Sequence, residues 1–276
     1  MRAAVTARLL RIEAFRLTTA EPQALLAFYA ALGFEIGEQA AISAGEMRRF
    51  GLAGRGVRIA LSRAGSRLEL ESFEPAGRPY PRQANAADLC FQHFALPTTE
   101  IAAAWEQARA HGAEPISTAG PVQLPAAAGG VIAVKFRDPE GHPLELLQWP
   151  GTTHPHRNAA ALGIDHSAIS VADVIASQTF YRALGLEPDP GTINHGPTQA
   201  ALDALAEVIV DVVPLRALQR DPHLELLGYR HPRGRPAEPL RVNDVAATRI
   251  VWAADTDAIL RDLDGHLHVL QRQPGA

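Results

Sequence analysis

The chain has 276 residues, of which 47% are hydrophobic and 20% charged, and its formal net charge is −4 at pH 7. This charge gives no reason to expect nucleic acid or an anionic membrane as a partner, and no apolar stretch approaches the length of a membrane span. Cys90 is the only cysteine, which excludes an intrachain disulfide, and residues 1–15 hold no apolar core of signal-peptide length. We therefore expect a cytoplasmic protein, monomeric or homodimeric, of one or two domains.

The first part of the chain predicts a unit of strand, helix and further strands over roughly residues 10–75. Its first strand is expected at 12–17 and its last at 68–73. Between them, residues 21–32 carry an apolar face that ends at Gly33, which is typical of a helix closed by a glycine.

A second unit, over roughly residues 88–149, follows the same order. Its strands and its helix are expected, in chain order, at 90–96 (strand), 101–110 (helix), 131–136 (strand) and 144–149 (strand). The last two strands are separated by Asp138-Pro139-Glu140-Gly141, whose proline and glycine suit a tight hairpin turn. Residues 150–160 read as a linker, so units one and two would form a first domain over 10–150.

A third unit, over roughly residues 163–230, repeats the first. Phe180-Tyr181 is followed two residues later by Leu-Gly, as Phe28-Tyr29 is in unit one. Residues 188–200 read as a looped insertion, and the Pro, Gly and Arg of 230–239 as a second linker or loop.

A fourth unit, at about residues 244–271, is truncated. It keeps a first strand at 248–253 and a last hairpin, with no room between them for the helix. Units three and four would form a second domain over 160–272.

The tripeptide Leu-Glu-Leu ends three of these units, with its glutamate at Glu69, Glu145 and Glu225. In a strand this alternation places each carboxylate on the face opposite its leucines. Aligning the units matches four first-strand positions and four last-strand positions. The first-strand positions are Ala14, His93, His166 and Thr248, and the last-strand positions are Glu69, Glu145, Glu225 and Val269. This alignment puts His268 on the opposite face, where we expect it to meet solvent.

At this point the chain resembles the vicinal oxygen chelate superfamily, which includes glyoxalase I, bleomycin- and fosfomycin-resistance proteins and extradiol dioxygenases. The resemblance covers about residues 10–271 and rests on three motifs. These are Phe28-Tyr29 with Leu32-Gly33-Phe34, the run from Phe136 to Leu146, and Gly163-Ile164-Asp165-His166 with Phe180-Tyr181 and Leu184-Gly185-Leu186. It implies an α+β fold of four βαβββ-type units, the fourth without its helix, paired into two curved mixed sheets that enclose a cavity. Each unit would give one metal ligand from its first strand and one from its last.

The pairing of the units decides which metal site exists. If neighbours pair, units one and two would offer Glu69, His93 and Glu145, and units three and four would offer only His166 and Glu225. If unit two pairs with unit three, one cavity gathers His93, Glu145, His166 and Glu225, a set like that of glyoxalase I. We favour the second pairing, which leaves Glu69 alone in a metal-free cavity. A glutamate on an edge strand is usually solvated, and we expect this for Glu69.

Such a set suits one divalent ion of Zn, Ni, Mn, Fe or Co, acting as a Lewis acid on a small substrate with vicinal oxygens. The resemblance implies a lyase or isomerase that forms a metal-stabilised enediolate, with Glu145, or second Glu225, as general base. His223 is a candidate partner of Glu225, and Tyr229 a candidate for the cavity mouth. Two alternatives remain open: an Fe(II) extradiol-type dioxygenase, which would need an unusual triad from the middle units, and a non-catalytic small-molecule binding protein of the bleomycin-resistance kind.

Overall fold

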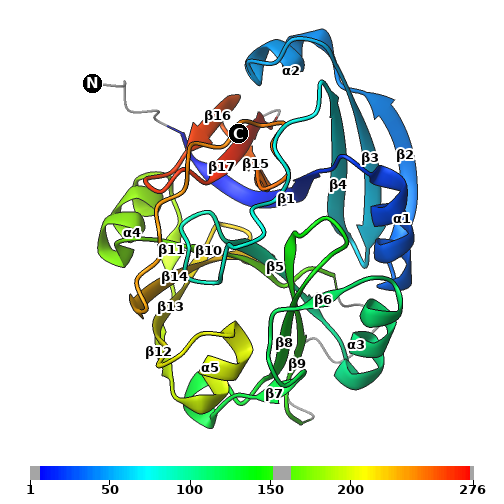
Figure 1. The fold of residues 1–276 in the computed structure, drawn as a ribbon. Coiled ribbons are helices and arrows are strands. Elements are labelled where there is room, and N and C mark those ends of the chain that lie inside the picture. The colour runs from blue at the N-terminus through cyan, green and yellow to red at the C-terminus, as the bar shows by residue number, and fades with distance from the viewer. Residues whose placement is uncertain (1–6, 152–162, 274–276) are drawn as a thin grey trace.

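The computed structural model describes residues 7–151 and 163–273, which fold into two curved mixed sheets stacked on one another (Figure 1). Residues 152–160 of the expected linker lie outside the described residues, as do the chain ends. Where the chain is described, no helix is both long and apolar enough to cross a membrane.

The first sheet combines strands from both ends of the chain. Its strand order is β16 (Ala258–Arg261), β17 (Leu267–Arg272), β15 (Arg249–Ala254), β1 (Leu9–Thr18), β4 (Ser66–Glu74), β3 (Arg55–Arg63) and β2 (Glu35–Ala41). Strands β1 and β15 join the two halves as an antiparallel pair with Phe15 opposite Ile250. Unit one therefore pairs with unit four.

The second sheet is built from the middle of the chain. Its strand order is β11 (Glu187–Pro188), β13 (Ile209–Arg216), β14 (His223–His231), β10 (His166–Ser170), β5 (Gln92–Pro97), β9 (Pro143–Gln148), β8 (Ile132–Arg137) and β6 (Glu114–Pro115). Two short strands, β12 (Thr192–His195) and β7 (Val122–Gln123), pair with β13 and β8. Strands β5 and β10 meet as an antiparallel pair with Phe94 opposite Ser167, so the favoured pairing of unit two with unit three is confirmed.

Three of the four units carry the expected long helix. These are α1 (Pro22–Ala31), α3 (Ile101–Ala110) and α4 (Val174–Ala183). In unit four, residues 255–257 connect β15 to β16 directly, which confirms the missing helix. The α+β class and the two curved mixed sheets are likewise as expected.

Two short helices and one 3-10 turn, η1 (Ala126–Ala128), were not expected from the sequence. Helix α2 (Ala44–Arg49) precedes β3, and α5 (Pro197–Asp203) precedes β13, where a loop was expected up to residue 200. Pro197 sits at the start of α5, a position where its fixed φ and missing N–H cost nothing. Both helices lie over the glutamate-bearing face of a sheet, so they shape what that face can bind (Figure 1).

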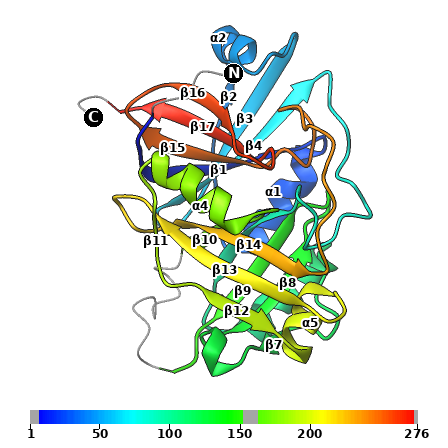
Figure 2. The same cartoon turned by 90° about the vertical axis from the view of Figure 1, so that its left-hand side faces the viewer.

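The main core lies between the two sheets and takes the leucines of all three Leu-Glu-Leu segments. Aromatic side chains from both sheets and three helices meet there, among them Phe15, Phe28, Tyr29, Phe94, Trp105, Phe136, Tyr181 and Trp252. Helix α4 closes one side of this core, between β15 and β14 (Figure 2). Because strand side chains alternate, the three glutamates lie on the faces turned away from this core, as the alternation predicted.

Two long connections, residues 75–91 and 232–247, cross between the sheets and run beside each other. Arg78 donates hydrogen bonds to Asp244, and Arg235 donates them to Asp88 from the same three donors, the backbone N–H, Nε and Nη2. The two arginines follow Gly77 and Gly234, whose backbones approach the opposite connection closely. These reciprocal contacts tie together the segments that lead into β5 and β15.

Candidate metal centre

A cavity of about 260 Å³ opens on the concave face of the second sheet. Its walls are mostly apolar and include Leu124, Leu147, Trp149, Val210 and Val212. A smaller set of polar side chains shares the cavity, namely His93, Lys135, Glu145, Asp165, His166, Thr192, Asn194, Gln199, Glu225 and Tyr229. An apolar cavity with a few convergent polar groups is the usual form of a small-molecule site.

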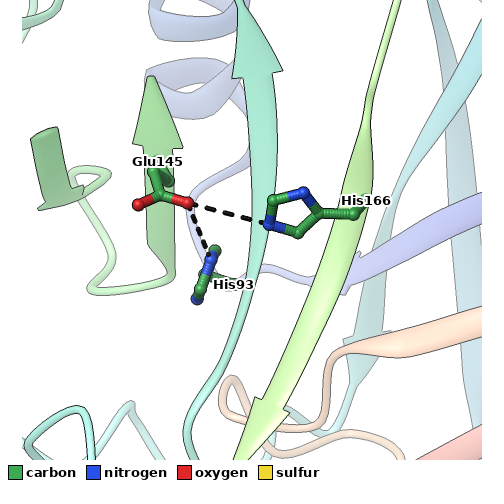
Figure 3. Close-up of side chains that lie close together, drawn as sticks. All are labelled: His93, Glu145 and His166. Carbon is green, nitrogen blue, oxygen red and sulfur yellow. Dashed lines mark ion pairs between the residues drawn. The ribbon is translucent and has the colours of Figure 1, made fainter. Parts of the chain in front are cut away.

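Three of the four expected ligands meet in one compact group. His93 on β5, Glu145 on β9 and His166 on β10 each offer a ligand atom, and these atoms all lie within 4.8 Å of one another. Glu145 Oε2 lies 3.3 Å from His93 Nε2 and 3.7 Å from His166 Nε2, so the carboxylate faces both rings (Figure 3). All three side chains are buried.

The strand register explains why these three side chains converge. Ala95 on β5 pairs with Glu145 on one side and with His166 on the other. His93 lies two residues away on the same face, opposite Ala168. Because both neighbouring positions are alanines, the imidazoles and the carboxylate have room to turn toward one point.

Glu225, the fourth expected ligand, lies at the edge of this group. It pairs with Ala168 in the ladder, and its Oε2 is 3.6 Å from His166 Nε2. Its side chain is 17% exposed, against 7% for Glu145. On its other side, His223 Nε2 lies 3.4 Å from Glu225 Oε1, which is the neighbour the sequence suggested.

The imidazole nitrogens lack partners in the way a metal site requires. Among the described residues, His93 Nδ1 and His166 Nε2 are buried without a hydrogen bond, and His93 Nε2 has only the ion-pair contact with Glu145. His166 Nδ1 lies 2.9 Å from Asp165 Oδ2, an acceptor that holds a proton on Nδ1, so Nε2 is the nitrogen that would bind a metal in exchange for its proton. Buried polar atoms normally have partners, so these residues fit a divalent cation well.

The charges of the group depend on one another. Burial lowers the pKa of His93. Burial also opposes the charged form of His166, but Glu225 and Asp165 outweigh it and raise the pKa of His166 to about 9. Burial opposes ionisation of Glu145, but its contact with His93 and the charge of Lys135 outweigh this and lower the pKa of Glu145. The carboxylates are thus held in the ionised form that binds metals.

The equivalent face of the first sheet holds ion pairs in place of ligands. Arg249 pairs with Leu267 in the β15–β17 ladder and Val251 with Val269, which makes Arg249, not Thr248, the counterpart of the histidines. The alignment that chose Thr248 was wrong by one residue, because it was anchored on sequence without the register.

Glu69 was expected to be solvated, and this expectation was also wrong, because the residue is only 4% exposed. It forms an ion pair with Arg16, which occupies the place of Ala95, and with Arg67 at 2.7 Å. Glu71 is fully buried and accepts from Arg249 at 2.7 Å. The arginine side chains fill this face, so the two concave faces of the molecule have different chemistry.

His268 lies on the face opposite the ligand positions, as expected, but that face is the core and not the solvent. It is 1% exposed, its Nδ1 accepts from Trp252 Nε1 at 3.0 Å, and its Nε2 lies 2.9 Å from the Tyr181 hydroxyl. The expectation of solvent exposure was wrong, because it treated the outer strands as a surface when helix α4 covers them.

Sequence reasoning missed a polar group beside the expected ligands. Lys135 on β8 and Asp203 at the end of α5 form a buried ion pair of 2.6 Å, and Tyr229 donates to the same aspartate at 3.0 Å. The one available signal was that Lys135 is the only lysine among the 26 basic residues that are lysine or arginine. Tyr229 lines the cavity, as suggested.

Comparison with known proteins gives a consistent picture. Residues 11–146 match the family model described as Glyoxalase/Bleomycin resistance protein/Dioxygenase superfamily. Glyoxalase I from Zea mays is similar in structure, with 15% sequence identity and a TM-score of 0.57; the match covers 96% of this chain and 92% of the maize chain. A Bacillus subtilis strain 168 protein described as a candidate dioxygenase is 13% identical, with a TM-score of 0.58, over 97% of this chain and 86% of its own.

No curated protein matches the sequence. At these identities the structural likeness bears on the fold alone. Through residues 11–146, the chain belongs to the glyoxalase/bleomycin resistance protein/dioxygenase superfamily.

Proposed function

We propose that this protein is a metal-dependent lyase or isomerase of glyoxalase type, acting on a small substrate with vicinal oxygens. His93, Glu145 and His166 would hold one divalent metal ion, with Glu225 as a fourth ligand. One observation carries the proposal: these side chains converge in a cavity where both nitrogens of His93 and the Nε2 of His166 are buried and make no hydrogen bond. The single cysteine, Cys90, is free, so a reducing cytoplasmic setting is part of the same proposal. We further propose that the protein is a monomer or a homodimer.

The chemistry follows from the donor set. When bound, a divalent ion supplies a Lewis acid that polarises substrate oxygens. Glu145 is confined between the two imidazoles, whereas Glu225 touches the group from its edge and is the more exposed. A metal ligand that also acts as general base must leave the metal to reach the substrate. The less confined Glu225 is therefore favoured for proton removal and Glu145 for metal binding, the reverse of the order that the resemblance implied. The apolar walls exclude water from the reacting carbon.

Metal analysis of the purified, reconstituted protein tests this proposal. We expect one equivalent of a divalent metal in the wild type, and its loss in His93→Ala and in His166→Ala. Glu69→Gln, in the other sheet, is the matched control and should keep the metal. If no divalent metal binds stoichiometrically, the proposal is wrong and a metal-free binding protein remains.

A second function is favoured by the three-residue group itself. Two histidines and one carboxylate on one face of a metal are the ligand set of non-haem Fe(II) oxygenases. The compact group of His93, Glu145 and His166 is such a set, drawn from the two middle units, and Glu225 stands apart from it. Oxygen consumption by the Fe(II)-loaded protein with catechols would support a dioxygenase, and its absence would leave the isomerase.

A further inference from the structure

A second polar group faces the same cavity as the metal ligands. Lys135, Gln199 and Tyr229 line it, and all three contact Asp203. They come from β8, α5 and β14, so Asp203 brings together side chains from three elements around the cavity. Its position beside the ligands is set by register, because Lys135 pairs directly with Glu145 in the β8–β9 ladder.

Lys135 is unusual for its burial. Its side chain is 4% exposed, and lysines are among the residues least often buried. All the other strongly basic side chains of this chain are arginines. A lysine at this position provides a compact ammonium with three separate N–H donors. Among the cavity-lining residues, Lys135 is also the only permanent cation.

The partners of Asp203 show how this ammonium is held. Asp203 Oδ1 accepts from Lys135 Nζ at 2.6 Å, while Oδ2 accepts from Gln199 Nε2 at 2.7 Å and from the Tyr229 hydroxyl at 3.0 Å. The aspartate therefore uses both oxygens and fixes three side chains at once. Within the described residues, Asp203 is the only hydrogen-bond acceptor of the Lys135 ammonium, which has three N–H donors.

A purely structural role for the ion pair is already covered by other contacts. Ser117 Oγ donates to the Leu202 carbonyl at 2.8 Å, and Thr118 N donates to the Ala201 carbonyl at 2.9 Å. These bonds tie the end of α5 to unit two without any charge. The buried ammonium is thus not needed to hold α5 in place.

From these contacts we propose that Lys135 is a substrate-binding residue. Its ammonium, anchored by Asp203, donates hydrogen bonds to a negatively charged oxygen of the substrate that lies beside the metal-binding oxygens. The substrate class is a small, mainly apolar compound with two adjacent oxygens, bound as an anion. This assignment rests on the proposed function, and it adds the charge of the bound substrate and the residue that recognises it.

The size of the cavity agrees with this class. About 260 Å³ lies just below the range of about 300–1,000 Å³ common for sites of drug-sized ligands. Apolar walls would take the body of a single ring or a short branched chain. Glu145 and Glu225 would repel an anion in this space, so a cation beside the metal is needed to balance it.

Titration with 4-nitrocatechol tests the proposal, because its adjacent oxygens can bind a metal and its colour reports their ionisation. Wild type, Lys135→Met and Lys135→Arg are compared, each with and without metal. We expect the wild type to bind the ionised form, and Lys135→Met to bind it more weakly by about tenfold or more while keeping its metal. The arginine variant should recover part of the affinity.

A second pair of ligands distinguishes the two sources of negative charge. If Lys135 pairs with a carboxylate, 3,4-dihydroxybenzoate should lose affinity in Lys135→Met and 3,4-dihydroxybenzamide should not. If Lys135 pairs with an ionised hydroxyl, both should weaken together. Thr118→Val is the structural control: it removes the contact of the Thr118 hydroxyl with the Ala201 carbonyl of α5 without touching the charge. It should leave binding and the colour of bound 4-nitrocatechol unchanged.

Equal binding of 4-nitrocatechol by wild type and Lys135→Met, with and without metal, overturns the assignment of Lys135. A weakening that Thr118→Val reproduces also overturns it, since the effect would then come from α5. A wild type that binds no metal contradicts the proposed function instead, and the metal-free titrations still decide the role of Lys135.

Discussion

Arg249 occupies in the first sheet the place that His166 occupies in the second. The antiparallel pairs β1–β15 and β5–β10 have matching registers, with Arg249 opposite Arg16 and His166 opposite Ala95. The change from alanine to arginine at the second position fills the space in which the imidazole of the other sheet meets its carboxylate. One duplicated scaffold thus carries a ligand group on one face and a closed network of ion pairs on the other.

Replacing Arg249 by Met should destabilise the protein strongly. Its guanidinium is fully buried and donates to Glu71, which is itself fully buried. Removing one partner of a buried pair leaves an uncompensated charge, and the expected loss is about 3–5 kcal/mol in the free energy of unfolding. Arg16 and Arg58 also face Glu71, so the lower end of that range is expected. Urea unfolding measures it, with the exposed Arg55→Met as the control.

The repeat, the missing fourth helix and the positions of His93, Glu145 and His166 were all accessible from the sequence. They depend on local patterns: strand alternation, a glycine after an apolar helix, and equal spacing of matched residues. Pairing of unit two with unit three followed from placing both histidines in one cavity. The sequence therefore predicted the repeated units and the residues by which these units differ.

The errors share a different cause. Thr248 was chosen over Arg249 because one residue of register cannot be read from a short strand without its partner. Glu69 and His268 were expected in solvent because a polar side chain in a strand is normally exposed. Here Arg16 and the Tyr181–Trp252 pair bury them with partners from distant segments. Such long-range partners leave no trace in local sequence.

The contribution of His268 to the stability of the protein should decrease at acidic pH. Burial lowers the pKa of this imidazole to about 4, from a usual value near 6.5, because its neutral form is held between Tyr181 and Trp252. A lowered pKa means that this contribution to stability is complete above pH 6.5 and is lost as the pH falls toward 4. The stability difference between wild type and His268→Gln should therefore shrink, by about 3 kcal/mol, over this interval.

Chemical unfolding of both proteins at several pH values measures this difference. His111→Gln, at the exposed end of helix α3, is the matched control variant. A difference for His268→Gln that stays constant from pH 6.5 to 4 would show that the imidazole is not held in its neutral form.

The crossing connections should tolerate no side chain at Gly234. A Cβ there would lie 1.8 Å from the carbonyl oxygen of Ala87, which belongs to backbone and cannot turn aside. Gly234→Ala should therefore lower the unfolding free energy by about 1–3 kcal/mol or more, and disturb the neighbouring Arg235–Asp88 ion pair. Gly45→Ala is the comparison, since its Cβ would meet nothing closer than 3.9 Å within helix α2. Equal melting temperatures for the two variants would contradict this account of the connections.

Glu145 and Glu225 should differ in what their loss removes. Glu145 lies between both imidazoles, so Glu145→Gln takes away the charge at the centre of the ligand group and should lower metal affinity by tenfold or more. Glu225 touches only His166 within the group, so Glu225→Gln should keep most of the metal but lose proton transfer at the substrate carbon, by about 10²–10⁴-fold. Metal content and exchange of substrate hydrogen for deuterium, measured on the same samples, separate the two effects. Because glutamine keeps the size of glutamate and one acceptor oxygen but cannot take up a proton as a carboxylate does, a variant that keeps its fold and metal yet exchanges no hydrogen identifies its glutamate as the base. If Glu145→Gln is that variant, the roles of the two glutamates are the reverse of those proposed.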